Sequence, residues 1–164
     1  MKKFELTSEF VTFLGKKLFR IKALVSFGDV KEGELGGLVE KEENLDQSGN
    51  AWVYGNARVS GDARVSGNAR VSGDAQVSGN AWVSGDAWVQ NCRDYSATSC
   101  FGSENRTTTF FRTKDGGISV RCGCFYGTLN EFREKVKERH GDSRLAKEYL
   151  MLADLMEFRL SKDE

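Results

Sequence analysis

Seven consecutive six-residue repeats of the form Gly-(Asn or Asp)-Ala-x-Val-x run from Gly49 to Gln90. In each repeat the Ala and the Val are two residues apart, so both side chains point to the same side of an extended strand. The Gly and the Asn or Asp after it tolerate positive φ, which permits a sharp turn once per repeat. A helix is excluded, because a period of six gives no 3.6-residue apolar stripe. The repeats therefore predict a coil of short strands and corners, with Ala and Val inside.

The order of residue types within the repeats resembles that of the hexapeptide-repeat, left-handed β-helix proteins. In that family an aliphatic residue is followed four positions later by a small one. Three pairs in this chain match the pattern: Val53 with Ala57, Val59 with Ala63, and Val65 with Ala69. The resemblance implies a triangular prism whose left-handed coils each contain three of these repeats, or 18 residues.

Residues 1–30 are predicted to form an N-terminal β-hairpin. FVTFL and LFRIKALVSF are two apolar runs, and Gly15 between them occupies the turn. The end faces of a solenoid are otherwise bare, so the hairpin is expected to cap the first coil with its aromatic side chains.

Residues 31–90 are assigned to the β-helix itself. Upstream of the regular repeats, Gly33–Ser48 is predicted to form one degenerate coil, in which Val39 and Leu45 are in phase with Ala51. The total is a little over three coils, which is about the minimum for a stable solenoid.

Residues 91–164 lack the repeat and predict a C-terminal α+β unit. The stretches 107–113 and 118–125 flank the turn sequence KDGG and predict a second hairpin. This unit is long enough to form a small core of its own against the β-helix.

Two helices are predicted after this hairpin. Thr128 and Glu131 form a capping box that opens a helix ending at Gly141. An apolar stripe predicts a second helix over about 144–160. The expected fold is mainly β: a short left-handed parallel β-helix with an N-terminal β-hairpin cap and a C-terminal α+β cap of a hairpin and two helices.

The fourth residue of each repeat points outward and varies only among Arg, Gln and Trp. With 18 residues per coil, Arg70 lies between Trp52 and Trp88, and neighbouring guanidinium and indole groups are at cation–π distance. The same residue types are enriched at interface hot spots, and they stack bases and hold phosphates. Self-stacking and a binding face are both open interpretations. The candidate ligand-binding or partner-binding residues are Trp52, Arg58, Arg64, Arg70, Trp82 and Trp88.

Metal binding is the weaker interpretation of two groups of residues. The Asn and Asp at the repeat corners are explained by the turn, and no second carboxylate stacks beside each Asp. The cysteines are spaced C-x7-C and C-x-C instead of the C-x2-C of zinc ribbons, so reduced thiols buried in a small core are expected. No cofactor is expected. Zinc stays a weak alternative for Cys92, Cys100, Cys122 and Cys124.

Enzymatic activity is not expected. Many hexapeptide-repeat proteins are acyltransferases and some are zinc hydratases, and both use histidines that project from the coils. This chain has one histidine, His140, at the end of a predicted tail helix. A three-histidine zinc site is therefore impossible, and the coils lack the usual general base for acyl transfer. Acyl transfer by His140 is the remaining catalytic alternative.

The balance of charge limits the class of partner. The chain has 24 basic and 24 acidic residues, and no segment is a polycationic tail, so bulk binding of duplex DNA is not expected. The start of the chain lacks the apolar core of a signal peptide, and no run approaches the roughly 20 apolar residues that span a bilayer. These features predict a cytoplasmic protein that does not enter the membrane.

Nearly the whole chain also resembles a narrower group of small proteins that bacterial phages and prophages encode. Outside the repeats, the stretches that carry this resemblance are KLFRIKAL, GDVKEGELGGLVEKEENL, FFRTKDGG, GCFYGTLNEF and KVKERHGD. Phages use small non-catalytic proteins largely to manipulate the host, so the leading hypothesis is a non-catalytic binding protein that counteracts a bacterial antiviral defence in the host cytoplasm. Two mechanisms are open: sequestration of a nucleotide immune signal, or docking on a defence protein, such as a CRISPR effector, that is thereby blocked.

A structural protein is the alternative from another class. Bare β-helix ends stack into filaments, although the hairpin and the helices are expected to block both ends here. Prisms of this type associate side by side, so a trimer or a dimer of the chain is expected.

Overall fold

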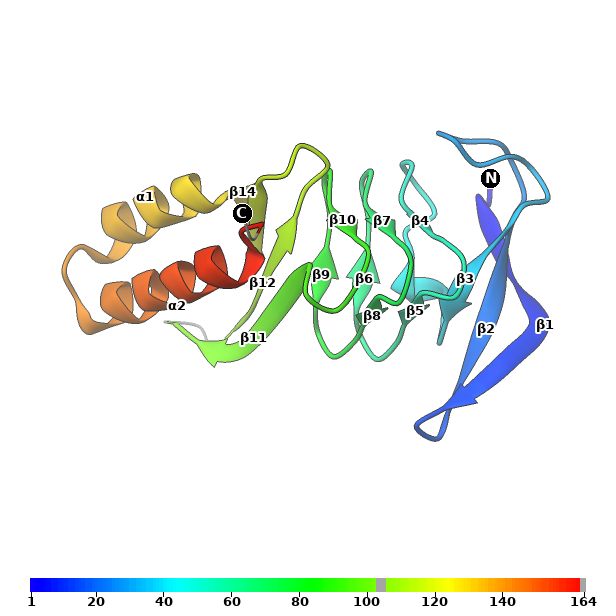
Figure 1. The fold of residues 1–164 in the computed structure, drawn as a ribbon, viewed down its shortest axis with the longest axis horizontal. Coiled ribbons are helices and arrows are strands. Elements are labelled where there is room, and N and C mark those ends of the chain that lie inside the picture. The colour runs from blue at the N-terminus through cyan, green and yellow to red at the C-terminus, as the bar shows by residue number, and fades with distance from the viewer. Residues whose placement is uncertain (103–105, 163–164) are drawn as a thin grey trace.

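The computed structural model describes residues 1–102 and 106–162. The chain is mainly β with two helices, and its elements follow one another along the long axis of the molecule (Figure 1). The N-terminal hairpin lies at one end, the helices lie at the other, and the repeats lie between them. Within the described ranges, no helix combines the length and the apolar character needed to cross a membrane.

The N-terminal hairpin is confirmed. Strand β1 (Phe4–Phe13) pairs antiparallel with β2 (Lys16–Ala23). The two turn residues, Leu14 and Gly15, both have positive φ, at 49° and 78°, as the twist-compatible two-residue turn requires. Strand β2 also pairs antiparallel with β3 (Leu35–Val39), so the hairpin continues one of the sheets of the repeats.

Each six-residue repeat contributes one two-residue strand. These strands are β4 (Trp52–Val53), β5 (Arg58–Val59), β6 (Arg64–Val65), β7 (Arg70–Val71), β8 (Gln76–Val77), β9 (Trp82–Val83) and β10 (Trp88–Val89). Strands β4 to β7 each pair in parallel with the strand 18 residues further on, as Trp52 pairs with Arg70 and Arg70 with Trp88. The strands form three columns, β3-β5-β8, β4-β7-β10 and β6-β9. We call residues 35–90 the repeat stack.

The interior of the repeat stack consists of the Ala and Val of every repeat, all of them fully buried. This core is continuous with the N-terminal hairpin through Phe4 and with the C-terminal sheet through Phe111. Every corner glycine from Gly49 to Gly85 has positive φ, between 59° and 69°. The pattern that predicted an inward Ala and Val with a glycine corner is therefore confirmed.

Outside the strand ladders, the backbone hydrogen bonds along the repeat stack have a direction. At Asn50, Ser60 and Ser72, for example, the backbone N–H donates to the carbonyl oxygen 17 residues later, at distances of 2.9 Å. The N-terminal end of the stack therefore has an excess of carbonyl oxygens, and the C-terminal end an excess of N–H groups. Since buried unpaired backbone groups are costly, both ends need partners of the complementary kind.

The chain supplies those partners from its two flanks. Lys3 is buried, and its ammonium group donates to the carbonyls of Ser48, Gly49 and Ala51, the last at 2.9 Å. At the other end, one carboxylate oxygen of Asp94 accepts from the N–H groups of Gln90 and Asn91, at 2.8 and 3.2 Å. Likewise, the backbone N–H of Trp82 donates to the hydroxyl of Thr109 at 3.0 Å.

The first, irregular segment of the repeat stack differs from the sequence expectation. Val39 pairs with Val59 and Leu45 with Val65, so both aliphatic side chains lie in the valine rows, and the expectation that they are in phase with Ala51 is wrong. Both side chains are larger than alanine, and they occupy the wider positions that the valines fill in the regular repeats. Eight residues separate Leu45 from Val53, where the regular repeats have six.

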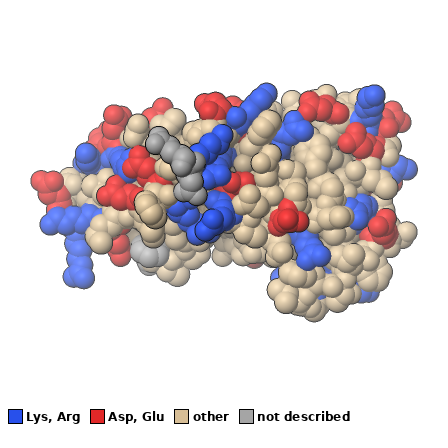
Figure 2. All heavy atoms as spheres, in the orientation of Figure 1, with Lys and Arg blue, Asp and Glu red and all other residues tan. Residues whose placement is uncertain are grey.

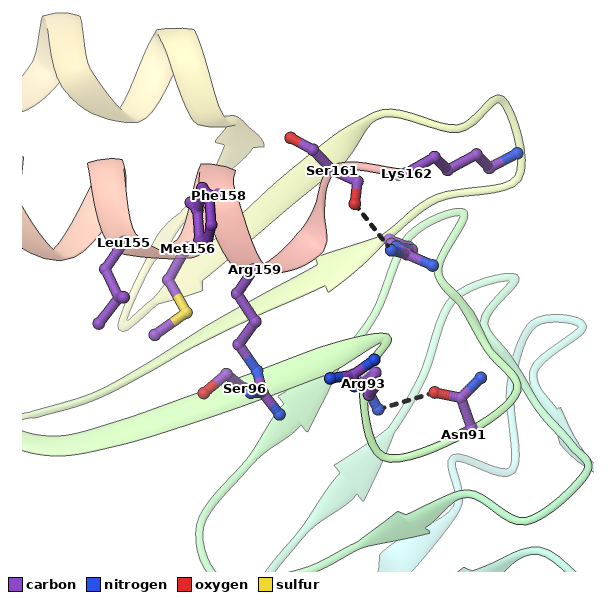
Figure 3. Close-up of a pocket in the computed structure, with 10 residues that line it drawn as sticks. Asn91, Arg93, Ser96, Leu155, Met156, Phe158, Arg159, Ser161 and Lys162 are labelled. Carbon is purple, nitrogen blue, oxygen red and sulfur yellow. Dashed lines mark hydrogen bonds between the residues drawn. The ribbon is translucent and has the colours of Figure 1, made fainter. Parts of the chain in front are cut away.

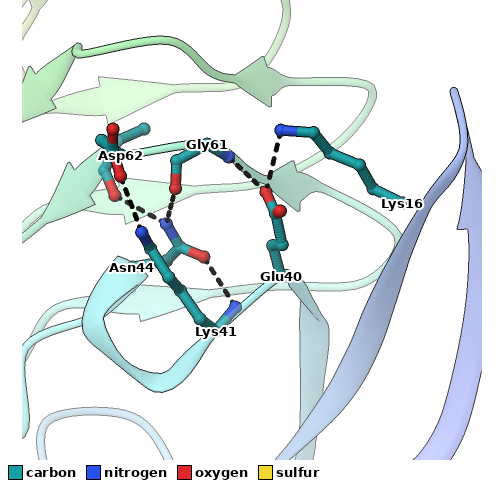
Figure 4. Close-up of polar contacts among 7 residues, drawn as sticks. Lys16, Glu40, Lys41, Asn44, Gly61 and Asp62 are labelled. Carbon is teal, nitrogen blue, oxygen red and sulfur yellow. Dashed lines mark hydrogen bonds and ion pairs between the residues drawn. The ribbon is translucent and has the colours of Figure 1, made fainter.

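A polar network ties this irregular segment to the regular repeats (Figure 4). The short helix η1 (Glu42–Asn44) ends in a fully buried Asn44, whose amide donates to the carbonyls of Gly61 and Ala63 at 3.1 and 2.8 Å. Glu40 accepts from the Gly61 N–H at 2.5 Å, and this hydrogen bond is the main cause that lowers the pKa of its carboxyl. In this irregular segment, side chains form hydrogen bonds to the next repeat that backbone groups form between the regular repeats.

The C-terminal part contains more strands than the sequence analysis predicted. Its sheet has the order β11 (Tyr95–Phe101), β12 (Arg106–Arg112), β13 (Ile118–Cys122), β14 (Phe125–Thr128), all antiparallel. The predicted hairpin corresponds to β12 and β13. The outer two strands were missed, because neither is a long alternating apolar run.

Both predicted helices are confirmed, as α1 (Leu129–His140) and α2 (Arg144–Leu160). The capping box is formed: the Glu131 N–H donates to the Thr128 hydroxyl at 3.2 Å, and the Thr128 N–H to the Glu131 carboxylate at 3.1 Å. Phe110 and Phe111 are neighbours on β12 and point to opposite faces of the sheet. Phe111 packs in the core of the repeat stack and Phe110 packs against the helices.

Candidate ligand-binding site

The six candidate residues do not share one surface. Their rows are formed, since Arg64 pairs with Trp82, and Arg70 with both Trp52 and Trp88. The guanidinium carbon of Arg64 lies 5.0 Å from the Trp82 ring centre, and that of Arg70 lies 5.5 Å from the Trp88 ring centre. The six are divided among the three strand columns, and different segments of the chain cover them.

Trp52 is fully buried, so the expectation that it projects into solvent is wrong. Phe4 and Phe27 pack edge-on against its indole, with ring centres 6.2 and 5.3 Å away. Gly36 of β3 permits this packing, because a Cβ there would lie 2.6 Å from a ring carbon of Trp52. Trp52 is therefore a core residue that joins the N-terminal hairpin to the first regular repeat.

Arg58 is also used by the N-terminal hairpin. Its guanidinium carbon lies 4.3 Å from the ring centre of Phe13 at the end of β1, and the side chain is half-buried. Such a contact contributes about 0.5–1 kcal/mol at an exposed site. It explains an outward arginine at this position without a ligand.

Trp82 is engaged within the chain as well. Arg64 lies against its ring at 5.0 Å and Arg121, from β13, at 3.7 Å. Its indole N–H donates to the Ser66 hydroxyl at 2.9 Å. With two guanidinium groups against the ring and its N–H satisfied, Trp82 and Arg64 fit the self-stacking interpretation.

Arg70 and Trp88 lie together in a cavity of about 240 Å3. The guanidinium of Arg70 is 4.6 Å from the Tyr54 ring centre and forms an ion pair with Asp29 at 2.5 Å. The ammonium of Lys114 lies 5.9 Å from the Trp88 ring centre. The cavity is lined by Gly28, Asp29, Asn50, Tyr54, Asn68, Arg70, Asp86, Trp88 and Lys114.

The chemistry of this cavity suits binding. Two aromatic rings and two cations face a space that also has carboxamide donors and acceptors from Asn50 and Asn68. Burial is the main cause that raises the pKa of the Tyr54 hydroxyl, so it remains a hydrogen-bond donor at neutral pH. Among the described residues the lining contains no His, Cys or Ser, but its Asp, Lys and Tyr side chains are also groups that transfer protons.

Sequence reasoning identified Arg70 and Trp88 as candidates and missed the other residues that line this cavity. Tyr54 had a visible signal, since it is the last residue of the first regular repeat, where five of the other six repeats have Ser. Asp29 and Lys114 had none, because they come from segments outside the repeats that only the fold brings to this face.

The cysteines are not assembled as a metal site. Cys92, Cys100 and Cys124 are exposed and Cys122 is half-buried, so the expectation of buried thiols is wrong for three of the four. Among the residues that the structure describes, no three His, Cys, Asp or Glu side chains come together as metal ligands. The zinc alternative is therefore not assembled in those residues.

His140 lies at the end of α1, where its ring stacks on Tyr149 with the centres 5.7 Å apart. It lines a small cavity of about 80 Å3 together with Cys122, Phe132 and other residues of the C-terminal part. None of the residues that line this cavity belongs to the repeat stack.

The regular repeats match a family model described as the YdcK beta solenoid repeat, over residues 51–64, 63–75 and 75–91. No curated protein matches the chain. The matched residues are those that form strands β4 to β10 and their corners. This part of the chain is therefore a β-solenoid repeat.

Proposed function

We propose that the chain is a non-catalytic binding protein that counteracts a bacterial antiviral defence in the host cytoplasm, and that the cavity at Arg70 and Trp88 holds a nucleotide immune signal. The likeness of the sequence to small phage and prophage proteins motivates the biological role. The observation that supports the ligand class is the convergence of Tyr54, Trp88, Arg70 and Lys114 on one cavity.

The proposed ligand places its base against an aromatic ring and its phosphate near the two cations, a combination that other proteins use for nucleotides. Asn50 and Asn68 offer donors and acceptors to the edge of the base. Asp29 forms an ion pair with Arg70. A phosphate then competes with Asp29 for the guanidinium, which makes Asp29 the internal competitor of the ligand.

Isothermal titration with a panel of cyclic nucleotides tests this proposal. Arg70→Ala and Trp88→Ala are each expected to weaken binding by about tenfold or more, equivalent to about 1.4 kcal/mol. The matched control is Arg64→Ala, which removes the same residue from the same repeat position but contacts Trp82 instead. Absence of heat with every nucleotide, from protein that is folded by circular dichroism, overturns the sequestering mechanism and leaves docking on a defence protein.

We also propose that the three strand columns wind into a left-handed β-helix whose two ends the hairpin and the C-terminal sheet cap. The 18-residue pairing and the complementary partners Lys3 and Asp94 at the two ends support this. Capped ends argue against filaments, and a discrete trimer or dimer is the proposed assembly. Sedimentation velocity over a wide concentration range tests it, since growth of ever larger species favours the polymer instead.

Acyl transfer remains the catalytic alternative, and it requires His140 to act as the base. The non-catalytic proposal expects no turnover of acetyl-CoA by the unmodified chain. The ring of His140 is stacked on Tyr149 in the C-terminal part, so His140→Ala is expected to leave that result unchanged. The non-catalytic proposal is contradicted if the unmodified chain turns over acetyl-CoA and His140→Ala abolishes that turnover.

A further inference from the structure

An open groove of about 860 Å3 lies beside α2, facing the segment that follows the last repeat (Figure 3). Leu155 and Met156 lie on the side of the helix that faces this groove, and Arg159 extends from the helix toward Ser96 and Arg93. None of its lining residues lines the cavity at Arg70. The groove is therefore a second, separate surface.

The apolar part of this surface belongs to a stripe on α2, of which Leu155 and Phe158 line the groove. Met151, Leu155 and Phe158 have the i, i+4, i+7 spacing of one helix face, and they are 72%, 56% and 85% exposed. The opposite face of α2, with Leu152 and Leu160, is buried in the core of the C-terminal part. A helix whose second apolar face is left in solvent is typical of a surface that contacts another protein.

The polar part of this surface is cationic. Arg93, Arg159 and Lys162 line the groove, and among the described residues its lining contains no carboxylate. The acidic residues Asp154 and Glu157 of α2 are held elsewhere, by Arg133 of α1 at 2.8 and 2.7 Å.

Ion pairs among the described residues do not neutralise the charges of Arg93, Arg159 and Lys162. Arg112 also lines the groove, but its guanidinium is paired with Asp94 at 2.9 Å. Arg93 and Lys162 have no ion pair within the described ranges. Figure 2 shows Lys and Arg side chains gathered where α2 ends beside the repeat stack. Among the described residues, the groove therefore combines apolar anchors with cations that form no ion pair.

We propose that this groove binds an acidic, amphipathic segment of a partner protein. Leu155 and Phe158 receive its apolar side chains, while Arg93, Arg159 and Lys162 pair with its carboxylates. A second copy of the chain is the poorer occupant, because a two-fold contact between identical grooves places like charges together. The proposal does not depend on the ligand cavity, and its failure leaves the nucleotide proposal intact.

Fluorescence anisotropy with a labelled peptide tests the groove on the full chain. The probe is a helix-forming peptide of about 15 residues with Leu at i, i+4 and i+7 and Glu at the flanking positions. Matched peptides have Gln or Lys in place of each Glu. Binding of the Glu peptide is expected to weaken about tenfold or more for the Gln peptide, to disappear for the Lys peptide, and to fall with added salt.

Variants of the chain separate the two parts of the surface. Leu155→Ser and Arg159→Glu both change exposed side chains, so the fold is kept, and each is expected to weaken binding about tenfold or more. Arg139→Glu, the same charge reversal at an exposed position of α1, and Arg70→Ala are the controls and are expected to have no effect.

Three results overturn the proposal. The first is equal affinity for the Glu and Lys peptides, or no loss with Leu155→Ser and Arg159→Glu. The second is a concentration-dependent dimer that Phe158→Ser abolishes, which makes a second copy the occupant. The third is tighter binding of a single-stranded oligonucleotide than of the Glu peptide at the same groove.

Discussion

Replacing Gly67 with Ala tests the stacking of the repeats directly. Gly67 has φ of +67°, and a Cβ added to it would lie 2.9 Å from the backbone nitrogen of Gly85 and 3.3 Å from its Cα. Gly79 is the matched control: it opens the same Gly-Asn-Ala sequence and has φ of +66°, but a Cβ there would meet nothing within 4 Å. The two substitutions therefore share the backbone strain and differ in the contact with the repeat 18 residues further on.

The two costs follow from this geometry. Placing an L-residue in the left-handed region costs about 1–2 kcal/mol, which is the expected loss in unfolding free energy for Gly79→Ala. Gly67→Ala incurs the same cost and adds a clash with backbone, which cannot rotate away as a flexible side chain would. Forced repacking of this kind costs about 1–3 kcal/mol, so we expect a total loss of about 2–5 kcal/mol.

Urea unfolding of both variants, followed by circular dichroism, measures the difference. The slope of the free energy against urea must be the same for both, so that the change in midpoint reports stability alone. If Gly67→Ala costs no more than Gly79→Ala, then the corners 18 residues apart do not stack as described, and the columns of outward side chains lose their physical basis.

Three further predictions concern the ends of the repeat stack and α1. Asp94→Asn removes the anion that pairs with Arg112 and accepts two backbone N–H groups, so unfolding free energy is expected to fall by about 2–4 kcal/mol in urea titrations. A loss below about 0.5 kcal/mol contradicts this role. Thr128→Ala removes the acceptor for the Glu131 N–H and is expected to cost about 1 kcal/mol in thermal unfolding, with Thr128→Ser restoring it. Burial lowers the pKa of Lys3 from 10.5 to about 8, against the opposing charge of Asp46. Between these two values the unfolded chain holds a proton that the folded chain has released, so stability is expected to rise with pH. Lys3→Met is expected to remove that rise. Parallel profiles of unfolding free energy against pH for the two proteins contradict this prediction.

The sequence alone predicted the features whose causes are local. The six-residue period decides which side chains point inward, because alternation along a strand and positive φ at glycine act within a few residues. The Ala and Val interior and the glycine corners followed from that period. The capping box at Thr128 and the apolar stripe of α2 placed both helices for the same reason, since a helix is specified by residues three and four apart.

Only the tertiary structure decided what covers an outward position. Trp52 and Trp88 occupy the same row, yet the hairpin buries the first and leaves the second beside a cavity. Asp29 and Lys114 reach that cavity from segments on opposite sides of the repeats. A period in the sequence states that a residue faces out, but burial depends on contacts between segments far apart along the chain, and those contacts exist only once the chain has folded.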